Sequence, residues 1–195
     1  MPAALLAAGT VRFGEFTYAS GATGPVYVDL RRLVSFPPLM DTVCSAMADL
    51  VSDMEGVDIV LGAATAGIPF ATLVSVRTGI PMCYIRKEAK GHGTKSLIEG
   101  VYEKGQRAVL IDDLVTSGAS KGVFVEGARE AGLQVEELAV VLDRRPDDDG
   151  GAIARLGVGL RSLVSIRQLL AVALEEGQAT SQDMERVDHW LKGGL

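Results

Sequence analysis

The chain has 195 residues, of which 48% are hydrophobic, and its formal net charge is −6. This length suits one domain with a sizeable core, and charged residues or glycines interrupt every apolar run well short of the roughly 18 residues that a membrane span needs. The acidic balance argues against a nucleic-acid surface that works through backbone electrostatics.

The N-terminal residues predict a short helix and then two strands. Residues 2–8 form an apolar helix that ends at Gly9, and this stretch has no basic flank and is too short for a secretory signal. The strands, Phe13–Gly21 and Pro25–Asp29, lie on either side of a turn of small residues. They form either a hairpin of core aromatic residues or a small cover over one edge of the main fold.

A long amphipathic helix is predicted to begin at Pro37 and Pro38. Its apolar stripe comprises Leu39, Met40, Val43, Cys44, Met47, Leu50, Val51 and Met54. We interpret the methionines as core residues. The chain has two cysteines, Cys44 in this helix and Cys83 in a later strand, and both are predicted to be buried thiols of a reducing, cytoplasmic protein.

A loop with glycine at both ends, Gly62–Gly67, follows the short buried strand Ile59–Leu61. Pro69 suits the first turn of the next helix. Small residues between a strand and a helix leave backbone N–H groups free to bind an anion. This loop is therefore a candidate anion site, although a glycine-bounded loop is a weak signal by itself.

The strongest local concentration of positive charge follows the strand Met82–Ile85. Residues 86–95 contain four Lys or Arg residues against one acid, Glu88, and two glycines flank His92 and prevent a stable helix or strand. Such a segment is either a solvated surface loop or a mobile lid that carries positive charge onto a polyanion. In an otherwise acidic chain we favour the lid.

The next strand carries the main chemical motif. The buried run Val109–Ile111 ends at two carboxylates, Asp112 and Asp113, and a helix is predicted a few residues later. The turn between them supplies hydroxyls and a glycine from Thr116, Ser117, Gly118 and Ser120. Free N–H groups suit a phosphate, and carboxylates suit ribose hydroxyls. The alternative is a strand–turn–helix whose acids merely cap the helix. Because adjacent side chains of an extended chain point to opposite sides, the two acids are not expected to share a proton.

The last third of the chain predicts two more strands and two helices. The strand Leu138–Leu142 is followed by Asp143–Arg144–Arg145–Pro146, at the end of a strand where α/β sheets place ligand contacts. Arg144 contacts either a ligand at this strand end or the acids Asp147–Asp149. Beyond it come a strand at Leu163–Ile166, a helix over 167–176 and a final helix capped by Thr180 or Ser181, with His189 and Trp190 interpreted as structural.

Three motifs resemble parts of known enzymes. The hydrophobic strand, Asp112–Asp113, two residues and Thr116–Gly118 resemble the phosphoribosyl pyrophosphate motif of type I phosphoribosyltransferases. The basic segment resembles the catalytic loop of orotate phosphoribosyltransferases in Arg86, Lys87, Glu88, Lys90, His92, Gly93 and the following Ile98-Glu99-Gly100. The N-terminal strand pair is similar to the hood of the same enzymes. The resemblance extends from about residue 13 to residue 145.

The alternation of strands and helices predicts an α/β fold with a mostly parallel central sheet flanked by helices. The resemblance narrows this to the type I phosphoribosyltransferase fold with a small N-terminal hood. Residues 1–195 would form a single phosphoribosyltransferase domain, with about residues 1–36 and part of the C-terminal region in the hood.

The resemblance also implies an activity, the transfer of the 5-phosphoribosyl group from phosphoribosyl pyrophosphate to orotate in pyrimidine (UMP) biosynthesis. The products would be orotidine 5′-monophosphate and pyrophosphate. Mg²⁺ would be held mainly by the donor, with no direct protein ligand assigned. A cytoplasmic homodimer is implied in which the lid is shared between subunits, without nucleic-acid or membrane partners. The alternatives are a purine or uracil phosphoribosyltransferase, or a non-catalytic regulator that senses the donor.

The resemblance assigns roles to matching residues. The catalytic residues would be Lys90, His92, Arg86 and Lys87, which act on the pyrophosphate. The donor would bind these four and Asp112, Asp113, Leu114, Val115, Thr116, Ser117, Gly118, Ala119 and Ser120. Orotate would contact Thr116, Arg144 and Tyr27, and the pyrophosphate loop would comprise Ala64, Thr65, Ala66 and Gly67. Ala19 and Ala66 stand where many members have lysine, so either the lid compensates or the donor binds less tightly.

Overall fold

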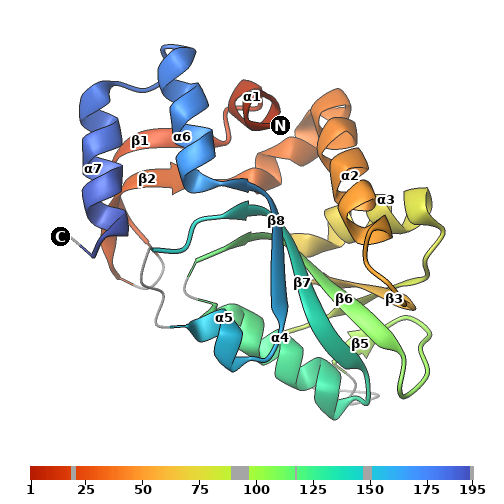
Figure 1. Cartoon of the computed structure of the whole chain (residues 1–195). Coiled ribbons are helices and arrows are strands. Elements are labelled where there is room, and N and C mark those ends of the chain that lie inside the picture. The colour runs from red at the N-terminus through yellow and green to blue at the C-terminus, as the bar shows by residue number, and fades with distance from the viewer. Residues whose placement is uncertain (19–20, 89–96, 117, 147–150, 194–195) are drawn as a thin grey trace.

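The structure, a computed structural model, describes residues 1–18, 21–88, 97–116, 118–146 and 151–193. A six-stranded sheet in the order β5-β4-β3-β6-β7-β8 forms its centre (Figure 1). Neighbouring strands are parallel except β4 and β5. The strands are β3 (Ile59–Ala63), β4 (Met82–Ile85), β5 (Ile98–Glu99), β6 (Arg107–Val115), β7 (Gln134–Asp143) and β8 (Gly159–Ser165).

Helices cover both faces of this sheet. One face packs against α2 (Pro37–Ser52) and α3 (Gly67–Thr78), and the other against α4 (Ala119–Glu130) and the short α5 (Ala152–Arg155) (Figure 1). Successive residues of β6 alternate between the two cores, because strand side chains alternate in direction. Val109 and Ile111 join the core beneath α2 and α3, and Leu110 joins the core beneath α4. The predicted α/β architecture is thus confirmed.

A second, smaller sheet lies at the N-terminal end of the chain. After α1 (Pro2–Ala7), β1 (Val11–Thr17) and β2 (Thr23–Val28) pair antiparallel, and the 3₁₀ helix η1 (Leu30–Ser35) leads into α2. Two C-terminal helices, α6 (Ile166–Glu175) and α7 (Ser181–Leu191), lie beside this sheet (Figure 1). Buried side chains of β2, α6 and α7 belong to the same hydrophobic core as those of α2 and α3. The N-terminal sheet and the two C-terminal helices are therefore packed against the main fold.

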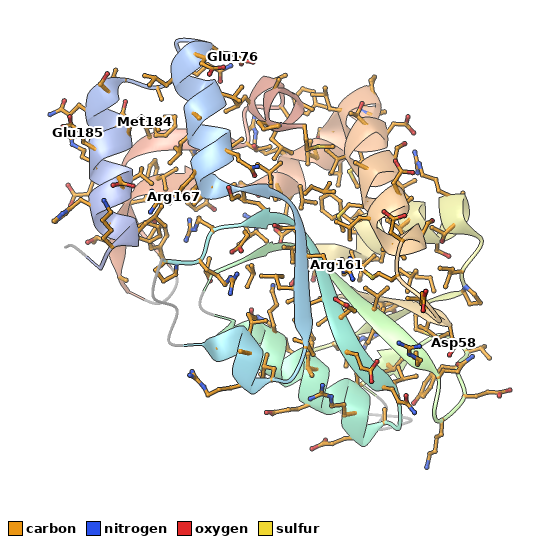
Figure 2. The ribbon with its side chains drawn as sticks, in the orientation of Figure 1. Asp58, Arg161, Arg167, Glu176, Met184 and Glu185 are labelled. Carbon is orange, nitrogen blue, oxygen red and sulfur yellow. The ribbon has the colours of Figure 1, made fainter. Side chains whose placement is uncertain are left out.

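The two C-terminal helices begin with matching caps. Ser165 and Thr180 each form a capping box with the residue three positions later, so Thr180 rather than Ser181 caps α7. Figure 2 shows Arg167 at the start of α6, and its guanidinium forms an ion pair with Asp188 of α7. The caps determine where the two helices begin, and the ion pair joins the helices to each other.

Local predictions for other elements are mostly confirmed, with four differences. Strand β6 runs past both acids to Val115, because pairing with β7 continues through Leu114 and Val115. The 3₁₀ helix η1, the strand β5 and the helix α5 have no counterpart in the predicted elements, and all three are short. Within the described residues, no helix is long and apolar enough to cross a bilayer.

The two cysteines are buried and form no disulfide, as expected. Burial raises the pKa of the Cys44 thiol to about 12 and also raises the pKa of Cys83. A thiol in such surroundings is poorly nucleophilic. A catalytic role for either cysteine is therefore not supported.

Candidate active site

A cavity of about 510 Å³ lies at the carboxyl ends of β3 and β6. The chain leaves β3 through α3 toward β4 and leaves β6 through α4 toward β7, in opposite directions along the sheet. In open α/β sheets, ligands bind at such a switch point. The cavity is lined by Val28, Asp29, Arg31, Ala64, Thr65, Ala66, Lys87, Asp112, Asp113, Leu114, Thr116, Ser120, Lys121 and Phe124.

The turn after β6 presents the first turn of α4 to this cavity. Gly118 is the N-cap of α4 with φ of 76°, a value that favours glycine, and a Cβ there would lie 2.9 Å from the side chain of Ile153. A glycine N-cap has no side chain with which to satisfy the first N–H groups of the helix. Thr116 and Ser120 add hydroxyls at the cavity wall. The turn therefore has the composition of an anion site.

The turn after β3 places a second helix start beside the first. Gly67 begins α3, and a Cβ on it would lie 2.3 Å from the carbonyl oxygen of Ile111. Only glycine allows α3 to approach β6 this closely. As a result Ala64, Thr65 and Ala66 line the cavity opposite the acids. No side chain caps the start of α3 either.

The two aspartates line the same cavity, although they are adjacent residues of an extended strand. At the end of the strand each carboxylate turns toward the backbone. Asp112 Oδ1 accepts the N–H of Asp113 at 2.9 Å, and Asp113 Oδ1 accepts the N–H of Leu114 at 2.7 Å. The alternative in which the acids cap the following helix is not what the structure shows.

The environments of these two acids differ. Asp112 is 6% exposed and forms an ion pair with Lys121, which is 4% exposed. Burial, and secondarily the neighbouring Asp112, raise the pKa of Asp113 to about 7. A carboxyl group that titrates near neutral pH in a cavity is a common feature of functional sites.

Three cavity residues, Asp29, Arg31 and Lys121, were not recognised from the sequence. Asp29 and Arg31 follow β2 and pair at 2.6 Å, and the hydrogen bond from Arg31 is the main reason why the pKa of Asp29 is lowered. A signal for Lys121 did exist. A lysine in the first turn of a helix sits at the positive end of the helix dipole, so it requires a compensating acid.

The basic residues that are predicted to bind the pyrophosphate do not all line the same cavity. Lys87 lines the cavity, and it also lines an adjoining cavity of about 430 Å³ that shares Ala64 and Thr65. Arg86 lines the adjoining cavity, where its guanidinium lies 3.0 Å from Glu99. The other predicted lid residues, Lys90 and His92, lie outside the described residues, as do Ser117 and Ala19.

Arg144 is buried, with 8% of its surface exposed, and it does not line the cavity. Its guanidinium carbon lies 4.7 Å from the ring centre of Tyr18 and 5.3 Å from that of Trp190. Its backbone N–H donates to Val115 in the cavity strand at 2.9 Å. Within the part of the chain that the structure describes, its Nε atom has no hydrogen-bond partner. Burial lowers the pKa of Arg144.

The neighbouring arginine behaves differently. Arg145 makes a two-pronged contact with Asp143, with its Nη2 at 2.8 Å from a carboxylate oxygen. The acids at 147–149, proposed as alternative partners of Arg144, lie outside the described residues. An unsatisfied buried guanidinium nitrogen is costly, so Arg144 is suited to receive an anion.

Tyr27 and His189 also lie outside the lining of the main cavity. The Tyr27 ring packs against Phe16 with 5.5 Å between ring centres, and its hydroxyl lies 3.4 Å from Arg31. His189 and Trp190 line a separate cavity of about 370 Å³ between the N-terminal sheet and α7. Among the described residues, no group of three His, Cys, Asp or Glu is arranged to hold a metal ion.

Comparisons with known proteins agree with this arrangement. Residues 31–149 match the family described as "Phosphoribosyl transferase domain". The curated orotate phosphoribosyltransferase of Listeria monocytogenes serotype 4b (strain F2365) is 38% identical over 178 residues, which are 91% of this chain and 85% of that protein.

Solved structures give the same result. The orotate phosphoribosyltransferase of Aeropyrum pernix matches with a TM-score of 0.78 at 32% identity, over 92% of this chain and 99% of that one. The UMP synthase of Leishmania donovani matches with a TM-score of 0.86 at 36% identity, over 98% of this chain and 41% of that one. This chain thus spans less than half of that UMP synthase.

Proposed function

Because this chain belongs to the phosphoribosyltransferase family, and within it to the orotate phosphoribosyltransferases, we propose that it transfers the 5-phosphoribosyl group of phosphoribosyl pyrophosphate to orotate. The products are orotidine 5′-monophosphate and pyrophosphate, in pyrimidine (UMP) biosynthesis. The observation that carries this proposal is the cavity at the switch point, where Asp112 and Asp113 lie between the starts of two helices.

The donor occupies this cavity in our proposal. The N–H groups and hydroxyls of residues 114–120 hold the 5-phosphate, and the two aspartates hold the ribose hydroxyls. The loop Ala64–Gly67 and Lys87 receive the pyrophosphate. Support comes from the way two uncapped helix starts converge on one space, since each favours negative charge.

Catalysis in this proposal is electrostatic. The ribose carbon becomes cation-like as the pyrophosphate leaves, so the reaction is helped by fixed charge around the leaving group and by exclusion of water. Arg86, Lys87, Lys90 and His92 stabilise the departing pyrophosphate, with His92 as a hydrogen-bond or proton donor. Asp112 and Asp113 stay on the ribose side.

Arg144 binds the carboxylate of orotate in this proposal, and Thr116 and Tyr27 contact the base. The burial of Arg144 and its unsatisfied Nε support the assignment, because a carboxylate would provide the missing acceptor. Tyr18 and Trp190 hold the guanidinium from the N-terminal sheet and from α7. The hood thus comprises about residues 1–36 and part of the C-terminal region, within a single domain of residues 1–195.

Mg²⁺ accompanies the donor in our proposal and neutralises its phosphate charge. The chain fits a metal that the substrate brings, because the cavity lining offers aspartate carboxylates, whose oxygens suit a hard cation. We also propose a cytoplasmic homodimer in which each lid reaches the cavity of the neighbouring subunit.

A spectrophotometric assay of orotate consumption tests this function. We expect consumption that requires both phosphoribosyl pyrophosphate and Mg²⁺. Consumption of a purine or of uracil instead would identify another phosphoribosyltransferase. A protein that binds the donor but releases no pyrophosphate with any base would be a regulator.

A further inference from the structure

We propose that Lys121 is a positioning residue of the donor site, whose ammonium group orients and neutralises Asp112 so that one net negative charge faces the polyanionic donor. This inference rests on the proposed function, because it names a further residue of the same cavity. Lys121 is not part of the three motifs by which the chain resembles known enzymes, and it was identified from the structure.

The contact between Lys121 and Asp112 is buried on both sides. The side chain of Lys121 is 6% exposed and that of Asp112 is 9% exposed, and the ammonium nitrogen donates to Asp112 Oδ2. The other oxygen of Asp112 accepts the N–H of Asp113 at 2.9 Å. Both oxygens of Asp112 are therefore engaged, and its carboxylate plane is fixed before any ligand arrives.

The backbone around Lys121 is also fixed. Lys121 belongs to the first turn of α4, and its N–H donates to the carbonyl of Gly118 at 2.9 Å. This is an unfavourable place for a cation, because the helix start already carries partial positive charge. The cost of burying a cation there is offset by the ion pair with Asp112.

The net charge of the two aspartates and Lys121 explains how this ion pair affects the binding of an anionic ligand. Asp112 and Asp113 together would present two negative charges to a donor that is itself strongly anionic, and like charges at such distances repel. The ammonium of Lys121 cancels one of these charges. Asp113 remains as the acid whose charge is not balanced by an ion pair in the described part of the chain.

A purely structural pair is the competing explanation. In that case Lys121 and Asp112 stabilise each other, and the loss of the pair lowers the melting temperature without a specific effect on donor binding. A positioning role instead predicts a change in donor affinity and in its pH dependence for protein that is still folded.

The decisive variants are Lys121→Met, which removes the charge, and Lys121→Gln, which keeps an N–H donor for Asp112 but no charge. We expect the Kd of Mg²⁺-phosphoribosyl pyrophosphate, measured by calorimetry on folded protein, to rise at least about tenfold in both. The pH below which affinity declines should move up by about one unit, because the charge of Lys121, which lowers the pKa of Asp113, is then missing. Lys121→Arg should retain the wild-type pH profile.

The matched control is Lys192→Met, which removes an exposed lysine paired with Asp188 at 2.6 Å in α7. This variant should leave the Kd of the donor and its pH profile unchanged. A folded Lys121→Gln protein with a wild-type Kd and pH profile would overturn the proposal. Loss of folding in both charge-removing variants would also overturn it, because the pair would then be required for folding itself. If the wild-type protein itself binds no donor, the proposed function fails instead.

Discussion

At the scale of single residues, the two adjacent aspartates show how surroundings separate chemically identical groups. Asp112 is tied into an ion pair and a backbone hydrogen bond. Asp113 is half-buried beside that negative charge, and its partial burial and the neighbouring charge raise its pKa to about 7. Its protonation therefore changes within the physiological pH range, and this has consequences for binding and for stability.

Donor affinity is predicted to decline as the pH falls from 8 to 6. The ribose hydroxyls need a carboxylate acceptor, and Asp113 takes up a proton below about pH 7. The Kd of Mg²⁺-phosphoribosyl pyrophosphate should rise by up to about tenfold per pH unit below that value. Calorimetric titrations across this range measure it. Asp113→Asn should bind weakly with only the pH dependence of the donor's own phosphates, and an identical slope in both proteins would contradict the assignment.

The raised pKa of Asp113 also predicts how the stability of the protein depends on pH. The sign follows from the coupling of protonation to folding. The pKa of Asp113 is raised in the folded state above the ordinary value of 3.8. Its contribution to stability is therefore fully present below about pH 4 and is lost as the pH rises through about 7. The gain in melting temperature on Asp113→Asn should accordingly be larger at pH 8 than at pH 5.

Arg144 gives the third prediction at this scale. Arg144→Ala should raise the KM for orotate about 10- to 100-fold, because it removes a charge-assisted hydrogen-bond partner of the carboxylate. Donor Kd should be unchanged. Arg145→Ala is the matched control, since that guanidinium contacts Asp143, and it should leave the orotate KM within about twofold. Equal loss of donor and orotate binding in Arg144→Ala would show that Arg144 does not select orotate.

At the scale of elements, α3 and α4 reach the cavity because glycine stands at the start of each. Gly118 supplies a positive φ, and Gly67 allows the helix to touch the backbone of β6. The two glycines thus help to determine both where these helices begin and where the cavity lies. The glycine in either turn is a requirement of close packing.

Gly67→Ala is predicted to destabilise the protein and to weaken the pyrophosphate loop. The added Cβ would meet the carbonyl oxygen of Ile111 at 2.3 Å, so α3 must move away from β6. We expect a loss of about 2 kcal/mol or more in the free energy of unfolding, measured with denaturant. Gly122→Ala is the control, because its Cβ meets only the Leu156 side chain at 3.4 Å. It should change stability by no more than about 1 kcal/mol.

At the scale of the whole molecule, the N-terminal sheet and the last two helices lie beside the central sheet and share its core (Figure 1). This arrangement brings Trp190, near the end of the chain, onto Arg144. It also leaves the cavity open to a ligand on the side of β3 and β6. We propose that the lid of the neighbouring subunit closes this opening.

Mixed dimers test this assignment. Lys90→Ala should lower kcat about 100-fold or more, and Asp113→Asn should disable the cavity of its own subunit. If each lid serves its neighbour, co-expressed chains should recover up to about one quarter of wild-type activity, because half of the dimers are mixed and each has one intact site. Lids that act within their own subunit would give no recovery, since no site would then be intact.

Sequence alone predicted the order of the main elements, the parallel sheet, the two turns of small residues that line the cavity and the buried thiols, because hydrophobic period and turn chemistry are properties of neighbouring residues. Only the tertiary structure decided that β6 extends through both acids, that Asp112 pairs with Lys121, and that Arg144 rather than Arg145 lies between Tyr18 and Trp190. Each of these depends on strand pairing or side-chain packing between segments that are separate in sequence. The pattern of neighbouring residues does not specify such contacts. These contacts form only when the elements pack together.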